Sequence, residues 1–230
     1  MYFIIFFFLI ARYGFKNVLI PNDLITKIPE VDPFSTPDLS VECPYPNPQD
    51  VKIDAIMVFH DPKNWGREIQ LMCDYMMWGG YLQPQPNVSN ECIASDKPVV
   101  FFSNDDLLWS LDYDTPRIGQ GGFRAAAEAV YEKISGKPLK REIYGKPHVK
   151  AFDYAEKTLN KYAKIEGKFD TIFMVGDNPA SDIVGSKNRD GWVPILLRTG
   201  VYQGGPEDGS PAVIVDDVLN AVEWGIAQSK

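Results

Sequence analysis

Apolar runs of strand length alternate with helical segments along the chain, and this alternation limits the fold more than any other feature. The apolar runs lie at residues 52–60, 97–104, 169–177 and 192–200. Helical segments are predicted at residues 61–80, 121–137, 146–167 and 179–191, and a last short strand and helix at 212–228. Such alternation predicts an α/β fold with a doubly wound parallel sheet. From Arg12 to Asp50 we expect an irregular connection, because residues 20–50 alone hold seven prolines.

Charge and cysteine content narrow the classes of partner. The 230 residues carry a formal net charge of −8 with a pI of about 4.8. Without a basic face that displaces counterions, nucleic acid is not expected as a partner. A small phosphorylated metabolite remains compatible, because one lysine or a Mg²⁺ ion sets the sign of a single pocket. The number of cysteines is odd, and none of the three (Cys43, Cys73 and Cys92) belongs to a C-x-x-C pair. This pattern favours a reducing, intracellular compartment.

The first eleven residues, "MYFIIFFFLIA", form an unusual apolar run. The run is too short to span a bilayer, which takes about 20 residues, so no membrane span is predicted. No lysine or arginine precedes it, as a secretory signal would require. A buried first strand or a mis-assigned start codon fits the run at least as well as a secretory signal does.

Two aspartates follow the apolar run in "IFMVGDNPASDIVG" and are the first candidates for a metal site. Ligands bind beyond the carboxyl ends of parallel strands, where Asp177 is expected. Asp182 is expected one helical turn further on, so that both carboxylates can face one crevice. Mg²⁺ usually takes one or two carboxylates together with phosphate and water. The alternative is structural, with Asp177 as a helix N-cap and Asp182 as a favourable acid in the first turn.

Lys146 in "YGKPHVKAF" favours the functional interpretation. It stands before a predicted helix and 31 positions ahead of Asp177. An ammonium at a helix start, beside free backbone amides, suits a phosphate group. The alternative is a solvent-exposed lysine in a loop.

The ordered set of "GKP", "MVGDNPASDIVG" and "PILLRTGVY" resembles the C-terminal half of a haloacid-dehalogenase (HAD) superfamily phosphohydrolase. More narrowly it is similar to the NagD-like branch, which carries an inserted α/β cap. The stretches "YGFKNVLIP" and "VVFFSNDDLLWS" resemble the cat-eye-syndrome critical-region protein 5 subfamily. The resemblance implies a Rossmann-like HAD core that lacks its first strands. It further implies that residues 1–96 are part of the cap and residues 97–230 the C-terminal part of the core.

The resemblance also implies roles for particular residues. HAD enzymes hydrolyse phosphate monoesters through an aspartyl-phosphate, with Mg²⁺ as cofactor. By match of motif, Lys146 steadies the phosphoryl group, Asp177 binds Mg²⁺ and Asp182 holds the metal shell. Asn104, Gly145 and Asn178 are the candidate substrate-binding residues. For Asn104, and for the turn "GQGG" at 119–122, a plain strand end and helix start is the alternative. A homodimer through the cap and a mitochondrial or cytoplasmic location are expected.

The family's first motif, D-x-D-G, supplies the nucleophile and does not occur in the 230 residues. Asp61 follows a predicted strand but has Lys63 where the second aspartate would stand. The chain as written is therefore expected to be a truncated, inactive form of a phosphohydrolase. The alternatives are a non-catalytic HAD-like binding or scaffold protein, and an unrelated doubly wound binding domain.

Overall fold

The computed structural model describes residues 13–15, 17–34, 36–40, 42–84, 98–164, 167–205 and 210–229. The chain divides into two compact units. The first comprises Met1–Asp54 and Asn64–Pro98, and the second comprises Ala55–Lys63 and Val99–Lys230. The apolar run at residues 1–11 and Cys92 lie outside the described residues.

The regular elements described in the first unit are helices and 3-10 turns, separated by irregular segments. Helix α2 (Pro21–Lys27) and the short 3-10 turns η1 (Pro29–Val31) and η2 (Pro48–Asp50) interrupt the segment expected to be irregular. The prediction missed α2 because its proline stands at the first helical position, where the missing N–H costs nothing. Leu24 and Ile25 of α2 are buried.

Helix α3 (Trp65–Met77) confirms the helix predicted at 61–80. The side chain of Asn64 caps its first turn by accepting a hydrogen bond from the Arg67 N–H at 3.1 Å. Gly80 follows the helix with φ +96°, and a Cβ there would meet the Ile53 carbonyl oxygen at 2.3 Å. Only glycine therefore fits this close approach.

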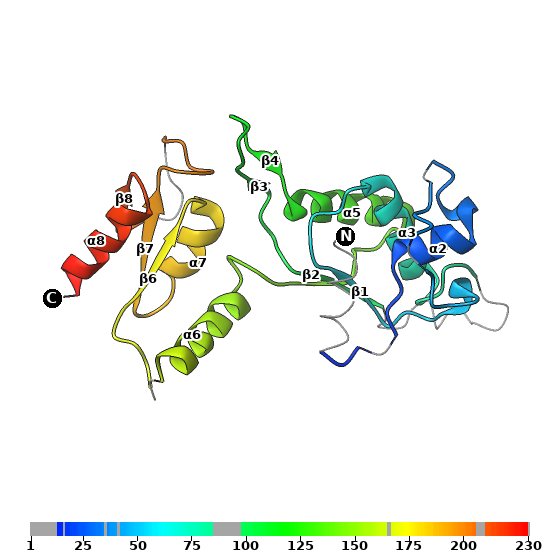
Figure 1. The fold of residues 1–230 in the computed structure, drawn as a ribbon, viewed down its shortest axis with the longest axis horizontal. Coiled ribbons are helices and arrows are strands. Elements are labelled where there is room, and N and C mark those ends of the chain that lie inside the picture. Colours follow the sequence, from blue (N-terminus) through cyan, green and yellow to red (C-terminus); the bar gives the residue numbers. More distant parts are fainter. Residues whose placement is uncertain are drawn as a thin grey trace. The chain divides into compact units, whose positions relative to one another are not determined.

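The second unit contains a first parallel sheet of order β1-β2-β5 (Figure 1). Strands β1 (Ala55–Val58) and β2 (Val99–Phe102) confirm two predicted strands. Strand β5 (Arg141–Ile143) was not predicted, because it is short and largely exposed and carries no apolar run. In register, Phe102 lies opposite Val58 on one side and Ile143 on the other.

Helix α5 (Gln120–Ser135) confirms the helix predicted at 121–137 and follows the hairpin formed by β3 (Leu108–Trp109) and β4 (Arg117–Ile118). Gly136 ends the helix in the left-handed conformation, as its sequence position predicts. Phe123 of α5 packs on Phe102 of β2 with 6.5 Å between ring centroids. This contact fixes α5 on the first sheet.

The second parallel sheet has the order β6-β7-β8 and confirms the α/β class (Figure 1). Its strands are β6 (Ile172–Gly176), β7 (Trp192–Leu197) and β8 (Val213–Val215). Helices α6 (Val149–Ala163) and α8 (Val218–Gln228) flank it, and the π-helical turn η3 (Pro179–Ile183) leads into α7 (Val184–Lys187).

Contacts between aromatic side chains show that helices cover both faces of this sheet. Phe152 of α6 packs edge-on against Trp192, and Trp224 of α8 packs edge-on against Phe173. Trp192 pairs in register with Ile172, the neighbour of Phe173. Because successive side chains of a strand point to opposite faces, α6 and α8 cover opposite faces of the sheet.

The predicted division into 1–96 and 97–230 stays a prediction. The structure groups residues 55–63 with the second unit, because β1 pairs with β2. The described parallel strands of this unit form two sheets, a separation that the linear pattern of strands and helices does not reveal.

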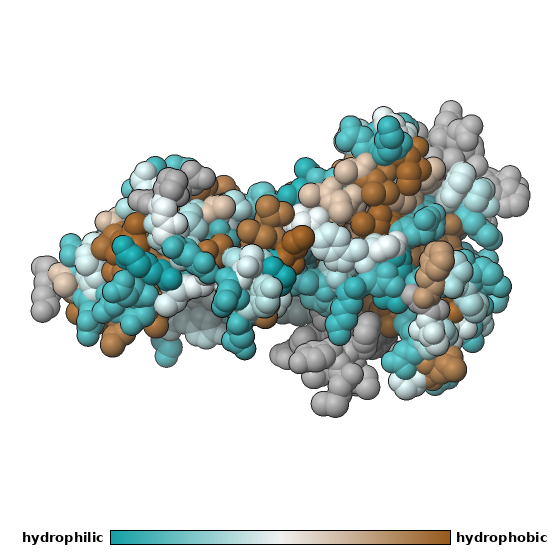
Figure 2. Space-filling view, turned by 90° about the horizontal axis from the view of Figure 1, so that it is seen from above, coloured by the Kyte–Doolittle hydropathy of each residue, from teal (hydrophilic) through white to brown (hydrophobic). Residues whose placement is uncertain are grey.

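Apolar residues remain visible between hydrophilic ones on the face shown in Figure 2. Exposed large apolar side chains occur on the β3–β4 hairpin, on α6 and on α8, and include Trp109, Tyr113, Ile118, Tyr154, Tyr162, Leu219 and Ile226. Within the described ranges, no helix is both long and apolar enough to cross a membrane.

Candidate active site

Asp177 stands directly after β6, at the carboxyl end of the second sheet. Its Oδ2 accepts a hydrogen bond from the Val201 N–H at 2.7 Å, and its carbonyl oxygen accepts one from the Tyr202 N–H at 3.0 Å. The loop after β7 therefore fixes the Asp177 carboxylate. The alternative of Asp177 as N-cap is wrong, because the capping side chain is that of Asn178, which accepts from the Ala180 N–H at 3.1 Å.

Asp182 lies in the π-helical turn η3 and is 1% exposed. Its Oδ1 lies 2.5 Å from Lys146 Nζ, and its Oδ2 accepts from the Asn178 N–H at 3.0 Å. A buried carboxylate is tolerated when it is paired and hydrogen-bonded in this way. Gly176 makes room for it, since a Cβ there would lie 2.2 Å from Asp182 Oδ2.

Lys146 reaches Asp182 from the loop between β5 and α6. The preceding Gly145 has φ +86°, and a Cβ there would meet the Ser103 carbonyl oxygen at 2.9 Å, so the loop lies directly on the end of β2. The side chain of Lys146 is 39% exposed. It is therefore a half-buried, paired cation and not an unpartnered loop lysine.

The charge environment holds Lys146 in its protonated form. Burial lowers the pKa of the ammonium, but this effect is outweighed by the hydrogen bond to Asp182 and by the negative charges of Asp182, Asp106 and Asp177. The pKa of Lys146 is therefore raised above its ordinary value of 10.5. The site thus keeps a full positive charge beside several carboxylates at neutral pH.

The remaining predicted residues lie at the edges of this arrangement. Asn104 Oδ1 accepts from the Asp106 N–H at 2.9 Å, which closes a local turn, as the structural alternative expects. Gln120, from the turn at 119–122, is 1% exposed and accepts from the Asn104 N–H at 3.0 Å. Asn178 Nδ2 donates to Asp106 Oδ1 at 3.3 Å. The proposed contact of Asn104, Gly145 and Asn178 with substrate stays a prediction.

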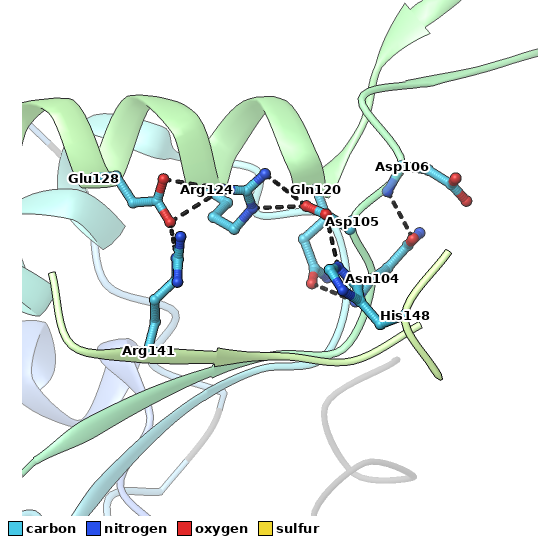
Figure 3. A network of polar contacts seen from close by, with 8 residues as sticks. All are labelled: Asn104, Asp105, Asp106, Gln120, Arg124, Glu128, Arg141 and His148. Atoms are coloured by element: carbon cyan, nitrogen blue, oxygen red, sulfur yellow. Dashed lines mark hydrogen bonds and ion pairs between the residues drawn. The ribbon is translucent and has the colours of Figure 1, made fainter. Parts of the chain in front are cut away.

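A polar network around Asp105 was not predicted from the sequence (Figure 3). His148 Nε2 lies 2.9 Å from Asp105 Oδ2, and Arg124 binds Asp105 Oδ1 at 2.7 Å. Arg124 also binds Glu128, which pairs with Arg141. The available signal was positional, since Asp105 and Asp106 follow a buried strand that runs parallel to its neighbours.

The donor set fits a magnesium ion only in part. Asp177 Oδ1 accepts no hydrogen bond from the part of the chain that the structure describes, and a hard carboxylate oxygen suits Mg²⁺. Both oxygens of Asp182 already accept protein donors. Among the described residues, no group of three or more His, Cys, Asp and Glu side chains is arranged to hold a metal. Asp177 is therefore the residue best placed to be a direct ligand.

Comparison with known proteins gives the family. The profile of the HAD-hydrolase-like family matches residues 143–221. Over 94% of its length, the chain is 36% identical to a Schizosaccharomyces pombe protein named cardiolipin synthase (CMP-forming) / mitochondrial hydrolase fusion protein, of which it covers 37%. Over 91% of its length, it is 35% identical to a Saccharomyces cerevisiae protein named mitochondrial hydrolase, of which it covers 66%.

The chain thus spans less than two thirds of the length of each of these curated relatives. A solved structure of a possible sugar phosphatase of the HAD superfamily from Cytophaga hutchinsonii aligns over 72% of this chain and 52% of its own. The sequence identity there is 21% and the TM-score 0.45. The narrower branch and subfamily stay predictions. Because the profile covers the segments of Lys146, Asp177 and Asp182 and two named hydrolases are similar over nearly the whole chain, the chain belongs to the HAD-like hydrolases.

Proposed function

We propose that the chain carries the phosphate- and metal-binding half of a Mg²⁺-dependent phosphohydrolase that acts on a small phosphate monoester. The observation that carries the proposal is the ion pair of Lys146 with buried Asp182, beside Asp177 at the carboxyl end of β6. Membership of the HAD-like hydrolases supports the reaction class.

Lys146 is the proposed phosphate ligand. An ammonium has three donors, and Asp182 takes one of them. The raised pKa of Lys146 keeps the ammonium charged at neutral pH, as attraction to a phosphate dianion requires. Asp182 is the proposed positioning group, because its carboxylate fixes the far end of a long and flexible side chain.

Asp177 is the proposed Mg²⁺ ligand, through its Oδ1. When bound, Mg²⁺ supplies electrostatic stabilisation of the charge on the phosphoryl oxygens. The Val201 N–H holds Asp177 Oδ2 and thereby orients the other oxygen. The protein's own contribution is to bind and orient the phosphate between one lysine and one carboxylate.

The covalent step needs a D-x-D-G element, which these 230 residues do not contain. The edge of strand β6 offers a position where a strand that carries this element could pair. In the described part of the chain β6 pairs only with β7, and all five of its residues are partly exposed. An edge strand presents unpaired N–H and C=O groups, so the edge of β6 away from β7 suits one more parallel strand, whose carboxyl end would lie beside Asp177.

The test joins the chain to an N-terminal segment that bears D-x-D-G. We expect Mg²⁺-dependent hydrolysis of p-nitrophenyl phosphate, abolished by Asp177→Asn and by Lys146→Met. Asp153→Asn on α6, which removes an ion pair to Arg189, serves as the control and should retain activity. Full turnover in Asp177→Asn or Lys146→Met would contradict the assigned roles. Binding of Mg²⁺ and inorganic phosphate without turnover would favour the alternative of a non-catalytic binding protein.

A mitochondrial location is proposed from the names of the two fungal relatives. Fractionation of source cells, with detection of the endogenous protein, tests it. A protein found only in the cytosolic fraction would overturn this location. The homodimer through the cap remains a prediction, for which sedimentation equilibrium is the direct measurement.

A further inference from the structure

Two consecutive acidic residues, Asp105 and Asp106, lie between the two segments that carry the candidate site. Asp105 contacts His148, two positions after Lys146. Asp106 Oδ1 accepts a hydrogen bond from Asn178 Nδ2 at 3.3 Å, one position after Asp177. One turn of the chain therefore touches both the lysine segment and the segment of the two candidate carboxylates.

This acidic turn is itself held firmly on helix α5. A Cβ at Gly121 would lie 2.4 Å from the Asp105 carbonyl oxygen, so the turn rests directly on the first residues of the helix. Arg124 donates from Nε to Asp105 Oδ1 at 2.7 Å, and its Nη1 binds Glu128 at 2.9 Å (Figure 3). The Asp105 side chain is only 15% exposed. Asp105 is thus a fixed point from which His148 is held.

His148 links the turn that carries Lys146 to Asp105. Its ring nitrogen Nε2 lies 2.9 Å from Asp105 Oδ2, and its backbone N–H donates to the Gly145 carbonyl oxygen at 3.0 Å. The turn 145–148 is therefore closed at the backbone and attached to Asp105 through one side chain. A fixed backbone turn leaves only the rotamers of the Lys146 side chain to be ordered, which favours its contact with Asp182.

We propose that Asp105 and His148 are positioning residues that hold the Lys146 ammonium against Asp182. Neither residue touches phosphate or metal in this proposal. Its consequence for catalysis rests on the proposed function of Lys146, whereas the restraint on Lys146 itself does not.

The test measures how fast Lys146 Nζ is acetylated by an amine-reactive ester, on the 230-residue chain without metal or phosphate. Mass spectrometry follows Lys146, with exposed Lys187 as internal reference. We expect His148→Ala and Asp105→Asn to accelerate acetylation of Lys146 about two- to fivefold, as loss of a partly exposed charge contact implies. His148→Gln, which keeps a donor on a side chain of similar reach, should restore the slow rate.

Asp153→Asn is the matched control, since it makes the same exchange at an ion pair of the same 2.7 Å length. Equal acetylation rates in all variants would overturn the proposal. If Asp105→Asn unfolds the chain, His148→Ala and His148→Gln test the same contact from its other side. If the variants show the expected reactivity, but the chain joined to a segment that bears D-x-D-G never hydrolyses a phosphate ester, the proposed function is contradicted and the positioning role stays intact.

Discussion

Lys146 Nζ and Asp182 Oδ1 lie 2.5 Å apart, although 36 positions separate the two residues in the sequence. The pair is asymmetric, because the side chain of Asp182 is 2% exposed and that of Lys146 is 39% exposed. Removal of the lysine leaves a buried carboxylate with one donor fewer. A buried charge without its partner is costly, whereas an exposed pair contributes little.

Lys146→Met is therefore expected to destabilise the chain. We expect the free energy of unfolding to fall by about 1–3 kcal/mol, the usual cost of an unsatisfied buried group. Urea unfolding measures it. The matched control is Lys150→Met, which breaks a 2.8 Å pair with Glu142 between two exposed side chains and should change stability little. An equal decrease in the free energy of unfolding in both variants would show that the burial of Asp182 does not contribute to the effect.

Alkaline pH should remove the same contribution in the wild-type chain. The pKa of Lys146 is raised above 10.5 in the folded state, so the pair's stabilisation is fully present below about 10.5 and is lost as pH rises through the folded pKa. The stability difference between wild type and Lys146→Met should therefore shrink above about pH 10.5. Other lysines and tyrosines titrate in both proteins and cancel in this difference. A difference that stays constant throughout would refute the raised pKa.

The strands and the longer helices follow from local patterns. The run "IFMVG" predicts β6 because consecutive apolar residues suit a strand covered on both faces. Gly136 predicts the end of α5 because the left-handed cap favours glycine. Strands of only two or three residues give no such signal, and so β5 and the β3–β4 hairpin were not predicted. The position of Asp177 follows from β6 for the same local reason.

The partners of the site could not be predicted, because they depend on contacts between distant segments. Nothing local indicates that Asp182 faces Lys146, or that His148 meets Asp105 across 43 positions. The distribution of the parallel strands over two sheets could not be predicted either, because the residues of a strand do not indicate which sheet it joins. A sequence pattern identifies which residues carry chemistry, and the tertiary fold decides which of them meet.

The buried thiol of Cys73 should resist alkylation in the folded chain. Cys73 is 2% exposed in helix α3, and burial, followed by the charge of Asp74, raises its pKa to about 11. Because the thiolate is the nucleophile, a thiol with this pKa stays almost wholly protonated near neutral pH. Iodoacetamide labelling, read by mass spectrometry, should modify Cys73 only as urea unfolds the chain. Half-buried Cys43 is the internal comparison, and rapid labelling of Cys73 before unfolding would contradict its burial.

Gly200 should prove essential to the geometry of Asp177. A Cβ at Gly200 would lie 2.1 Å from Asp177 Oδ2, at φ +113°. Gly204 has φ +98° with nothing within 4 Å of its Cβ, so Gly204→Ala incurs similar backbone strain without the collision. Gly200→Ala must displace the carboxylate or the loop that donates from Val201, and loss of such a supporting contact lowers metal affinity about 10- to 100-fold. Calorimetric titration with Mg²⁺ in the presence of inorganic phosphate should show this loss for Gly200→Ala and nearly wild-type affinity for Gly204→Ala. If both variants bind Mg²⁺ as the wild type does, Asp177 is not the ligand.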